Sequence, residues 1–236
     1  SSPLVAITAQ VGLNRIYKES HQIVDLVSLF KPVTKWADTI LTPASVPEMM
    51  HKAFSLAQQE RPGATYLAIP QDIEAMPMPA EFSPLKPKCS AKTYPALEQV
   101  KQAAELLRNA RYPIILAGHG VARAQCSQAL TDLAERYQIP VATTFMGKGV
   151  ISDKSPHALG VMGFMRHDYE NFAFDEADVI LSIGYELQEF APERMNPNAD
   201  KKIVHINRFA ADIDAHYNVD ISIESDIDLA IAALTE

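Results

Sequence analysis

Glycines that follow apolar, strand-like runs are the residues of this 236-residue chain best placed to bind a ligand. Gly118 and Gly120 come after one such run, Gly147 and Gly149 after a second, and Gly184 after a third. In a parallel α/β sheet, glycines at these places lie beyond the carboxyl ends of the strands, where they let the backbone approach a phosphate group. Gly118, Gly120, Gly147 and Gly184 are therefore a candidate nucleotide site. The alternative is that they only allow tight turns between strand and helix.

Other kinds of chemistry have less support in the residue pattern. Gly118-His119-Gly120 is followed by Arg123 where the dinucleotide fingerprint has its third glycine, so this motif is incomplete. Asp212 to His216 carries acidic residues and a histidine at two-residue steps, which bring ligands together only on a strand. A solvated loop is the simpler interpretation, and we expect no metal site. No Gly-x-Ser-x-Gly elbow and no reactive-cysteine motif suggests hydrolase chemistry.

The composition argues against several classes of partner. The net charge of -8 at pH 7 provides no basic surface of the kind that nucleic acid needs. No apolar run approaches the roughly 20 residues that cross a bilayer, and the first residues show no secretory pattern. Cys89 and Cys126 are the only cysteines, lack metal-binding spacing and are expected to be reduced. We expect a cytoplasmic protein without nucleic-acid or membrane partners.

Proline divides the chain into two parts. Four prolines fall between Met76 and Pro87, and such a run favours an extended linker, which we place at residues 76–95. Residues 96–236 alternate short apolar runs with amphipathic stretches. The expected strands are 114–117, 139–144, 179–183, 202–206 and 219–223, and the expected helices are 97–107, 125–137, 170–176 and 227–234. This alternation predicts an α/β fold: a complete Rossmann-like domain whose parallel sheet is covered on both faces.

Residues 1–75 show fewer elements of the same α/β class. Strands are expected at Leu4–Thr8 and Ala64–Ile69, and helices at Glu19–Leu29 and Val46–Gln59. The chain begins almost directly with a strand, and four elements are too few for a complete doubly wound domain. We therefore expect this part to be the end of a longer, truncated domain. Expressed alone, it should expose apolar surface and self-associate.

Several short motifs stand along both parts of the chain. They are His21-Gln22, Phe30-Lys31-Pro32-Val33-Thr34-Lys35, Glu60-Arg61-Pro62-Gly63, Pro70-Gln71-Asp72-Ile73, Thr143-Thr144-Phe145-Met146-Gly147-Lys148-Gly149 and Ile203-Val204-His205-Ile206. In this order and spacing they resemble the thiamine-diphosphate-dependent enzymes, and most of all acetolactate synthase of the catabolic type. The resemblance implies that residues 1–75 are the C-terminal part of the pyrimidine-binding domain. It implies that residues 96–236 are the central domain.

The resemblance also implies an activity for the full-length parent protein. With thiamine diphosphate and Mg²⁺, that protein decarboxylates pyruvate and transfers the two-carbon unit to a second 2-keto acid, as a homodimer or homotetramer. The cofactor supplies the difficult chemistry, and the protein supplies orientation and charge. The family's activating glutamate falls ahead of Ser1, and its Gly-Asp-Gly magnesium motif falls after Glu236. We therefore expect no catalytic residue in this chain, and no activity from these 236 residues alone.

Three residues take positions that line the substrate channel in the family. Gln22 matches a channel glutamine, His21 stands beside it, and Lys35 matches a lysine near the channel mouth, where a cation attracts a keto-acid carboxylate. The alternative is that His21 and Gln22 lie on the surface of a helix and that Lys35 is a solvated charge.

A departure from the family bears on flavin. Biosynthetic members bind FAD across the central domain with an arginine soon after the strand that matches residues 179–183. This chain has Glu186 at that place, and its carboxylate would repel a pyrophosphate. We therefore expect no bound FAD.

Other functions stay open at this point. A different thiamine-diphosphate decarboxylase or lyase acting on 2-keto acids is the nearest alternative. A non-catalytic scaffold for subunit packing, or an autonomous nucleotide-binding central domain, would belong to a different class. A ligand that selectively binds the folded state raises its melting temperature, which separates a nucleotide-binding domain from a scaffold.

Overall fold

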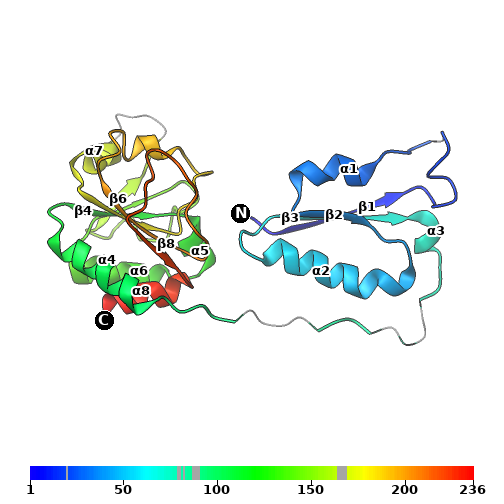
Figure 1. Ribbon diagram of the computed structural model, residues 1–236, viewed down its shortest axis with the longest axis horizontal. Helices are drawn as coiled ribbons and strands as arrows, with labels where there is room; N and C mark the ends of the chain where they lie inside the picture. The colour runs from blue at the N-terminus through cyan, green and yellow to red at the C-terminus, as the bar shows by residue number, and fades with distance from the viewer. Residues whose placement is uncertain (20, 79–80, 82, 87–90, 164–168) are drawn as a thin grey trace. The chain divides into compact units, whose positions relative to one another are not determined.

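A computed structural model describes residues 1–19, 21–78, 81, 83–86, 91–163 and 169–236. The chain divides into two compact units, Ser1–Ser90 and Ala91–Glu236 (Figure 1). The division falls inside the predicted linker at residues 76–95. Each unit is an α/β structure built on a parallel sheet, as the sequence predicts.

The second unit has six parallel strands in the order β6-β5-β4-β7-β8-β9. The central strands are apolar on both faces, which is typical of a parallel sheet that is covered on both sides. The strands are β4 (Pro113–Ala117), β5 (Val141–Thr143), β6 (Ala158–Val161), β7 (Val179–Ile183), β8 (Lys202–Asn207) and β9 (Ile221–Glu224).

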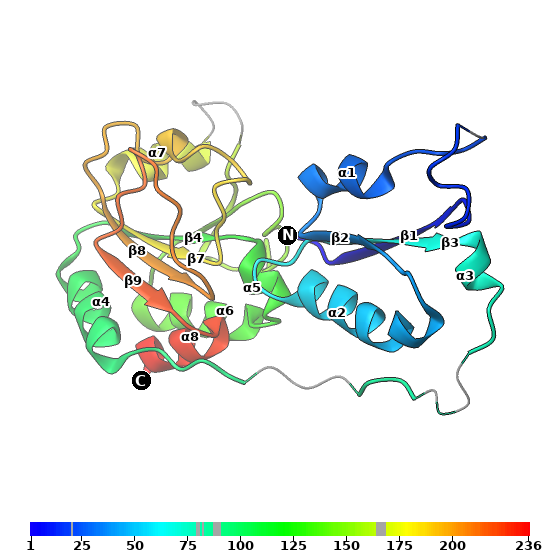
Figure 2. The ribbon, with the colours of Figure 1, turned by 45° about the vertical axis from the view of Figure 1, so that its right-hand side comes forward.

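Helices cover one face of this sheet, and one helix with several loops covers the other. Figures 1 and 2 show α4, α6 and α8 together below the sheet and α7 above it. The bounds are α4 (Leu97–Asn109), α5 (His119–Arg123), α6 (Ser127–Tyr137), α7 (Tyr169–Glu176), α8 (Ile227–Thr235) and the short 3-10 helix η3 (Pro192–Arg194). The strands and long helices predicted for this part are present, with ends that differ by a few residues.

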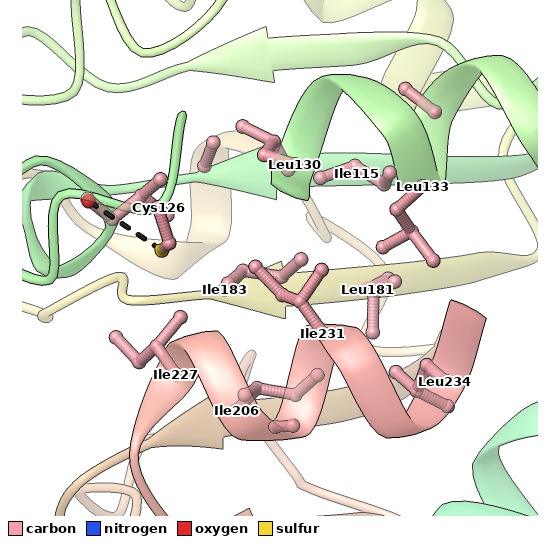
Figure 3. Packing of buried hydrophobic residues seen from close by; sticks show 14 of the residues in the cluster. Ile115, Cys126, Leu130, Leu133, Leu181, Ile183, Ile206, Ile227, Ile231 and Leu234 are labelled. Carbon is pink, nitrogen blue, oxygen red and sulfur yellow. Dashed lines mark hydrogen bonds between the residues drawn. The ribbon is translucent and has the colours of Figure 1, made fainter. Parts of the chain in front are cut away.

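The main core lies between the sheet and the lower helices. Figure 3 shows Leu130 and Leu133 of α6 and Ile231 of α8 directed toward Ile115 and Leu181 of the strands. All five are completely buried. Full burial of an aliphatic side chain of this size contributes roughly 1.5–3 kcal/mol. This core therefore fixes where the carboxyl ends of β4, β5 and β7 lie.

The first unit has only three parallel strands, in the order β1-β3-β2. In Figure 1, α1 lies above this sheet and α2 lies below it. The elements are β1 (Leu4–Gln10), α1 (Leu26–Phe30), η1 (Lys31–Val33), β2 (Trp36–Thr39), η2 (Pro43–Ser45), α2 (Val46–Gln58), β3 (Ala64–Pro70) and α3 (Gln71–Glu74).

Two expectations for the first unit are corrected by the structure. The helix predicted at Glu19–Leu29 is wrong, because the helix begins only at Leu26, where the Asp25 side chain accepts a hydrogen bond from the backbone N–H of Ser28. Gln22 precedes it with a φ of 62°, in the left-handed region that interrupts a helix. Strand β2 was not predicted, because its four residues are not uniformly apolar. The prediction of α2 is confirmed.

Both cysteines were predicted to be reduced. Cys126 is a free, buried thiol, and burial raises its pKa to about 11. Its Sγ lies 3.6 Å from the backbone oxygen of Val121, and Figure 3 shows it beside the core. Cys89 lies outside the described residues.

Candidate functional site

The carboxyl edge of the six-stranded sheet is where open α/β sheets bind ligands. The chain proceeds from β4 to β5 and β6 on one side, and from β7 to β8 and β9 on the other. The strand order therefore changes direction between β4 and β7. Gly118 follows β4 and Gly184 follows β7, so both lie at this point.

The structure brings three of the four candidate glycines together by packing backbone against backbone. A Cβ atom on Gly118 would lie 2.5 Å from the oxygen of Gly184 and 2.5 Å from the Cα of Tyr185. A Cβ on Gly120 would lie 2.6 Å from the Cα of Gly184, which itself has a φ of 64°. Gly147 packs separately, against the backbone oxygen of Ala117. These close approaches explain why glycines stand here without requiring a ligand, and they support the turn interpretation.

Charged side chains fill the space beside these glycines. Arg123 Nη1 donates to Glu186 Oε1 at 2.6 Å, and the Glu186 side chain is 5% exposed. The repulsion expected between Glu186 and a pyrophosphate is therefore offset, because an arginine pairs the charge of this carboxylate. This arginine is Arg123, which occupies the position of the third glycine in the dinucleotide fingerprint.

Glu189 is a member of the site that the sequence did not indicate. Its Oε1 accepts the backbone N–H groups of His119 and Glu186, both at 3.3 Å, and its Oε2 accepts the hydroxyl of Thr144. The Thr144 oxygen in turn accepts the backbone N–H of Gly147 at 2.9 Å. Residues 144 and 189 are far apart in the sequence, so no local motif could have revealed this contact.

Burial dominates the protonation of this cluster. Burial raises the pKa of Glu189, while the hydrogen bonds from Thr144, His119 and Glu186 act in the opposite direction. Burial also lowers the pKa of His119, and the positive charge of Arg123 adds to that effect. Both shifts favour the neutral forms of these side chains.

In the first unit, His21 and Gln22 lie on an exposed turn and not on a helix. Buried Gln10 at the end of β1 anchors this segment: its Nε2 donates to the Val24 oxygen at 2.7 Å, and its Oε1 accepts the N–H of Val11 at 2.9 Å. The Gln10 side chain therefore binds both ends of the segment from Val11 to Val24. Gln10 was not predicted, although a polar residue closing an apolar strand was a usable signal.

A second side chain anchors the same segment. Asp72 Oδ2, at the start of α3, accepts the N–H of Leu13 at 2.8 Å, and Oδ1 accepts the N–H of Ile73 at 3.1 Å. Gln10 and Asp72 stand at the carboxyl ends of β1 and β3, which are neighbours. Gln22, with its positive φ, thus lies in a turn that buried Gln10 and partly buried Asp72 hold in place.

Lys35 lies at the opposite edge of this sheet from Gln10. It directly precedes β2, and its backbone N–H pairs with the Ala64 oxygen at the start of β3. Its Nζ donates to the oxygens of Gln59 at 2.6 Å and Arg61 at 2.7 Å, beyond the end of α2. Burial lowers the pKa of Lys35, and the negative charge of Glu60 opposes that shift. The structure therefore does not bring Lys35 together with His21 and Gln22.

The part of the chain that the structure describes shows neither a metal site nor a membrane span. Within it, no three His, Cys, Asp or Glu side chains are grouped so that they could hold a metal ion. None of its helices combines the length and apolar character needed to cross a bilayer.

Fold and site together define an open α/β protein in two units, with its buried charges at the carboxyl edge of the larger sheet. Residues 100–234 match the family described as "Thiamine pyrophosphate enzyme, central domain", and the chain belongs to this family.

Curated relatives are similar across both units. The chain is 35% identical to the "Probable acetolactate synthase large subunit" of Methanococcus aeolicus over 98% of its length, and 36% identical to the protein of the same name from Methanocaldococcus jannaschii over 96%. It is 32% identical over its whole length to the "Glyoxylate carboligase" of Escherichia coli O157:H7. It spans 39–40% of the length of these relatives.

Proposed function

We propose that this chain is part of a thiamine-diphosphate- and Mg²⁺-dependent acetolactate synthase. Such an enzyme decarboxylates pyruvate and transfers the two-carbon unit to a second 2-keto acid. One observation carries the proposal: the similarity to proteins named acetolactate synthase covers 96–98% of the chain, including both units and the linker between them.

The described residues do not fit the Mg²⁺ ion that holds the cofactor's diphosphate. Magnesium takes carboxylate and other oxygen ligands, and the described ranges contain no such group of acidic side chains. The proposal therefore places cofactor binding in parts of the longer protein beyond these residues. It follows that the 236 residues by themselves should not turn over pyruvate.

We expect the first unit to form one wall of the substrate channel. His21 and Gln22 are exposed at the carboxyl side of β1, where the side chains of Gln10 and Asp72 hold their segment. Their side-chain N–H groups can donate hydrogen bonds to a keto-acid carboxylate and restrict its orientation. For Lys35, a channel role stays a prediction, and its two carbonyl contacts support a role in holding the turn after α2.

The proposal also includes the setting of the enzyme. We expect a cytoplasmic homodimer or homotetramer without bound FAD and without nucleic-acid or membrane partners. The candidate nucleotide site at Gly118, Gly120, Gly147 and Gly184 gains no support from the close backbone packing there.

A second candidate reaction is the joining of two glyoxylate molecules. It is favoured by the 32% identity with the protein named "Glyoxylate carboligase", which covers the whole chain. The two candidates differ in the side chain of the donor keto acid, a methyl group against a hydrogen. One methyl group changes binding by only about 1–3 kcal/mol, so the substrate must be determined directly.

The experiment supplies pyruvate or glyoxylate to the longer protein that contains this chain, with thiamine diphosphate and Mg²⁺. Formation of acetolactate with a higher kcat/KM for pyruvate is the expected result. In the same assay, Gln22→Ala should raise the KM for pyruvate about tenfold, a loss of roughly 1.4 kcal/mol. Gln102→Ala, on an exposed face of α4, is the matched control. A preference for glyoxylate would select the second candidate, and turnover of neither would refute both.

A further inference from the structure

The crevice at the carboxyl edge between β4 and β7 is the place where this fold would hold a dinucleotide such as FAD. A dinucleotide there needs backbone or hydroxyl donors aimed at its phosphates and enough room for them. In this structure the candidate donors belong to residues that follow β4, β5 and β7. His119 follows β4, Thr144 follows β5, and Glu186 follows β7.

All three of these positions donate to one internal carboxylate. Glu189 accepts the N–H groups of His119 and Glu186 and the hydroxyl of Thr144, so that a single side chain joins the ends of three neighbouring strands. Thr144 is completely buried, and its oxygen also accepts the N–H of Gly147. An anion from outside would have to displace Glu189 before it could use these donors.

The turn after β4 and the segment after β7 pack closely on each other. The turn after β4 lies directly on the backbone of Gly184 and Tyr185, because even one added carbon at Gly118 would come within 2.5 Å of both. Tyr185 is 1% exposed, and its hydroxyl donates to the Phe190 oxygen at 2.5 Å. The segment that carries Glu189 is thereby fixed at both ends.

The arginine beside this crevice is already paired with a carboxylate. Glu186 accepts the ion pair from Arg123 at 2.6 Å, whereas Glu189 accepts hydrogen bonds from two backbone N–H groups and one hydroxyl. The arginine that could have attracted a phosphate is thus already engaged. Within the described residues, hydrogen bonds rather than an ion pair hold the Glu189 carboxyl group in place.

We propose that Glu189 is an internal substitute for a ligand's phosphate: its carboxyl group occupies the donors of three strand ends and so keeps dinucleotides out of the β4–β7 crevice. Glu189 is a specificity-determining residue in this sense. The inference does not depend on acetolactate chemistry, because ligand binding and thermal unfolding test it without any turnover.

The test compares the 236-residue chain with Glu189→Ala and with the matched control Glu193→Ala, an exposed carboxylate of η3. Melting is followed by circular dichroism in buffer, in FAD, in ADP, in sodium formate and in sodium chloride of equal ionic strength. Formate is the probe for the vacated carboxylate position. Glu189→Gln serves as a second control, because it keeps the side-chain volume and leaves no room for formate.

For the wild-type chain, FAD and ADP at concentrations on the order of 1 mM should leave the melting temperature unchanged, since a ligand that binds the folded state would raise it. Glu189→Ala should melt about 4–10 °C lower, because three donors lose their acceptor. Formate should restore about half of that loss in Glu189→Ala, and neither Glu193→Ala nor Glu189→Gln should respond to formate more than to chloride.

Two results would overturn the proposal. One is a rise in the melting temperature of the wild-type chain with FAD or ADP, which would show that the crevice is open. The other concerns formate. The proposal is contradicted if formate raises the melting temperature of Glu189→Ala no more than chloride does, or if it raises that of Glu189→Gln by the same amount. Should Glu189→Ala fail to fold in buffer, its refolding yield in formate against chloride is the readout: a higher yield supports the proposal, and equal yields contradict it.

Discussion

The two units use the same parallel α/β construction and differ in how completely it is covered. In the second unit, all five residues of β7 are buried between helices and loops. In the first unit, β1 buries only Gln10, while Leu4 is 57% exposed and Ile7 is 45% exposed. Among the residues that the structure describes, strands β1 and β2 each pair with β3 alone, so each has an open edge.

The difference shows which parts of the molecule can be stable by themselves. A strand with neighbours on both sides and cover on both faces is stabilised within its own unit. An apolar strand with an open edge offers unpaired backbone groups and hydrophobic surface to other chains. The second unit should therefore be self-sufficient, whereas the first unit should depend on additional contacts.

Separating the units should give the largest effect. Residues 91–236 expressed alone should be monomeric and unfold cooperatively, because this unit has its own large core. Residues 1–90 alone should self-associate or precipitate, as we expect for residues 1–75. Size-exclusion chromatography with light scattering measures both. A monomeric, cooperatively unfolding first unit would contradict the comparison.

Shortening one apolar side chain in each unit should show the same difference between the units with a smaller loss of stability. Leu181→Ala in β7 removes a completely buried side chain and should lower the free energy of unfolding by about 2–5 kcal/mol. Leu4→Ala in β1 removes a mostly exposed one and should change it by less than about 1 kcal/mol. Urea denaturation of both variants checks this. Equal losses would mean that β1 is covered as well as β7.

Two glycines at the carboxyl edge separate packing from backbone strain. Gly118→Ala should destabilise the second unit by about 3 kcal/mol, because the new carbon meets the backbone of Gly184 and Tyr185. Gly149→Ala meets no atom within 4 Å, and only its φ of 93° is unfavourable, which costs about 1–3 kcal/mol. Thermal unfolding ranks the two. A larger loss at Gly149 would disprove the close packing at Gly118.

The anchored turn of the first unit should respond to loss of Gln10. Gln10→Met keeps the length of the side chain but cannot bond to Val11 and Val24. Amide hydrogen exchange in residues 11–24 should become about tenfold faster, which corresponds to roughly 1.4 kcal/mol of local stability. Gln58→Met at the exposed end of α2 is the control. An unchanged rate of amide hydrogen exchange in Gln10→Met would show that Gln10 does not hold this segment in place.

Two carboxyl groups at opposite edges of the larger sheet, Glu189 and Asp178, should change the stability with pH in opposite directions. This effect should be the smallest. Burial raises the pKa of Glu189 above its ordinary value of 4.5, so the folded state binds the proton more tightly than the unfolded state. Stability relative to Glu189→Gln should therefore fall as the pH rises from 4.5 through the higher folded-state pKa.

Asp178 should behave in the reverse way. Burial pushes its pKa upward, but the backbone N–H groups of Arg111 and Tyr112 hold it below its ordinary value of 3.8. Its contribution relative to Asp178→Asn is present above 3.8 and should be lost as the pH falls through the lower folded-state pKa. Melting temperatures of the wild type and both variants across pH check both signs. Responses of the same sign would refute one assignment.

Much of the larger unit could be predicted from sequence, because helices and loops cover both faces of its sheet. Strands such as β4 and β7 consist almost entirely of apolar residues because both faces are buried, and such runs stand out between amphipathic helices. Edge strand β2, with Asp38 and Thr39 among its four residues, has no such pattern. The predicted helix at Glu19–Leu29 failed because Gln10 holds the preceding segment in another conformation.

The candidate site was predicted less well because its contacts are long-range. The glycines were found from their position after apolar runs, but sequence could not show that Gly118 lies on Gly184. Arg123 and Glu186 were both noticed, and their ion pair was not, since 63 residues separate them. Glu189 carries no local signal because its three donors come from three different strand ends.

The central claim is that this chain is a non-catalytic part of a thiamine-diphosphate enzyme, and one assay tests it directly. The purified 236-residue chain is incubated with pyruvate, thiamine diphosphate and Mg²⁺, beside the longer protein that contains it. The predicted result is acetolactate from the longer protein and none from the 236 residues. Acetolactate formed by the 236-residue chain alone would contradict the claim, because it would place the catalytic groups among these residues.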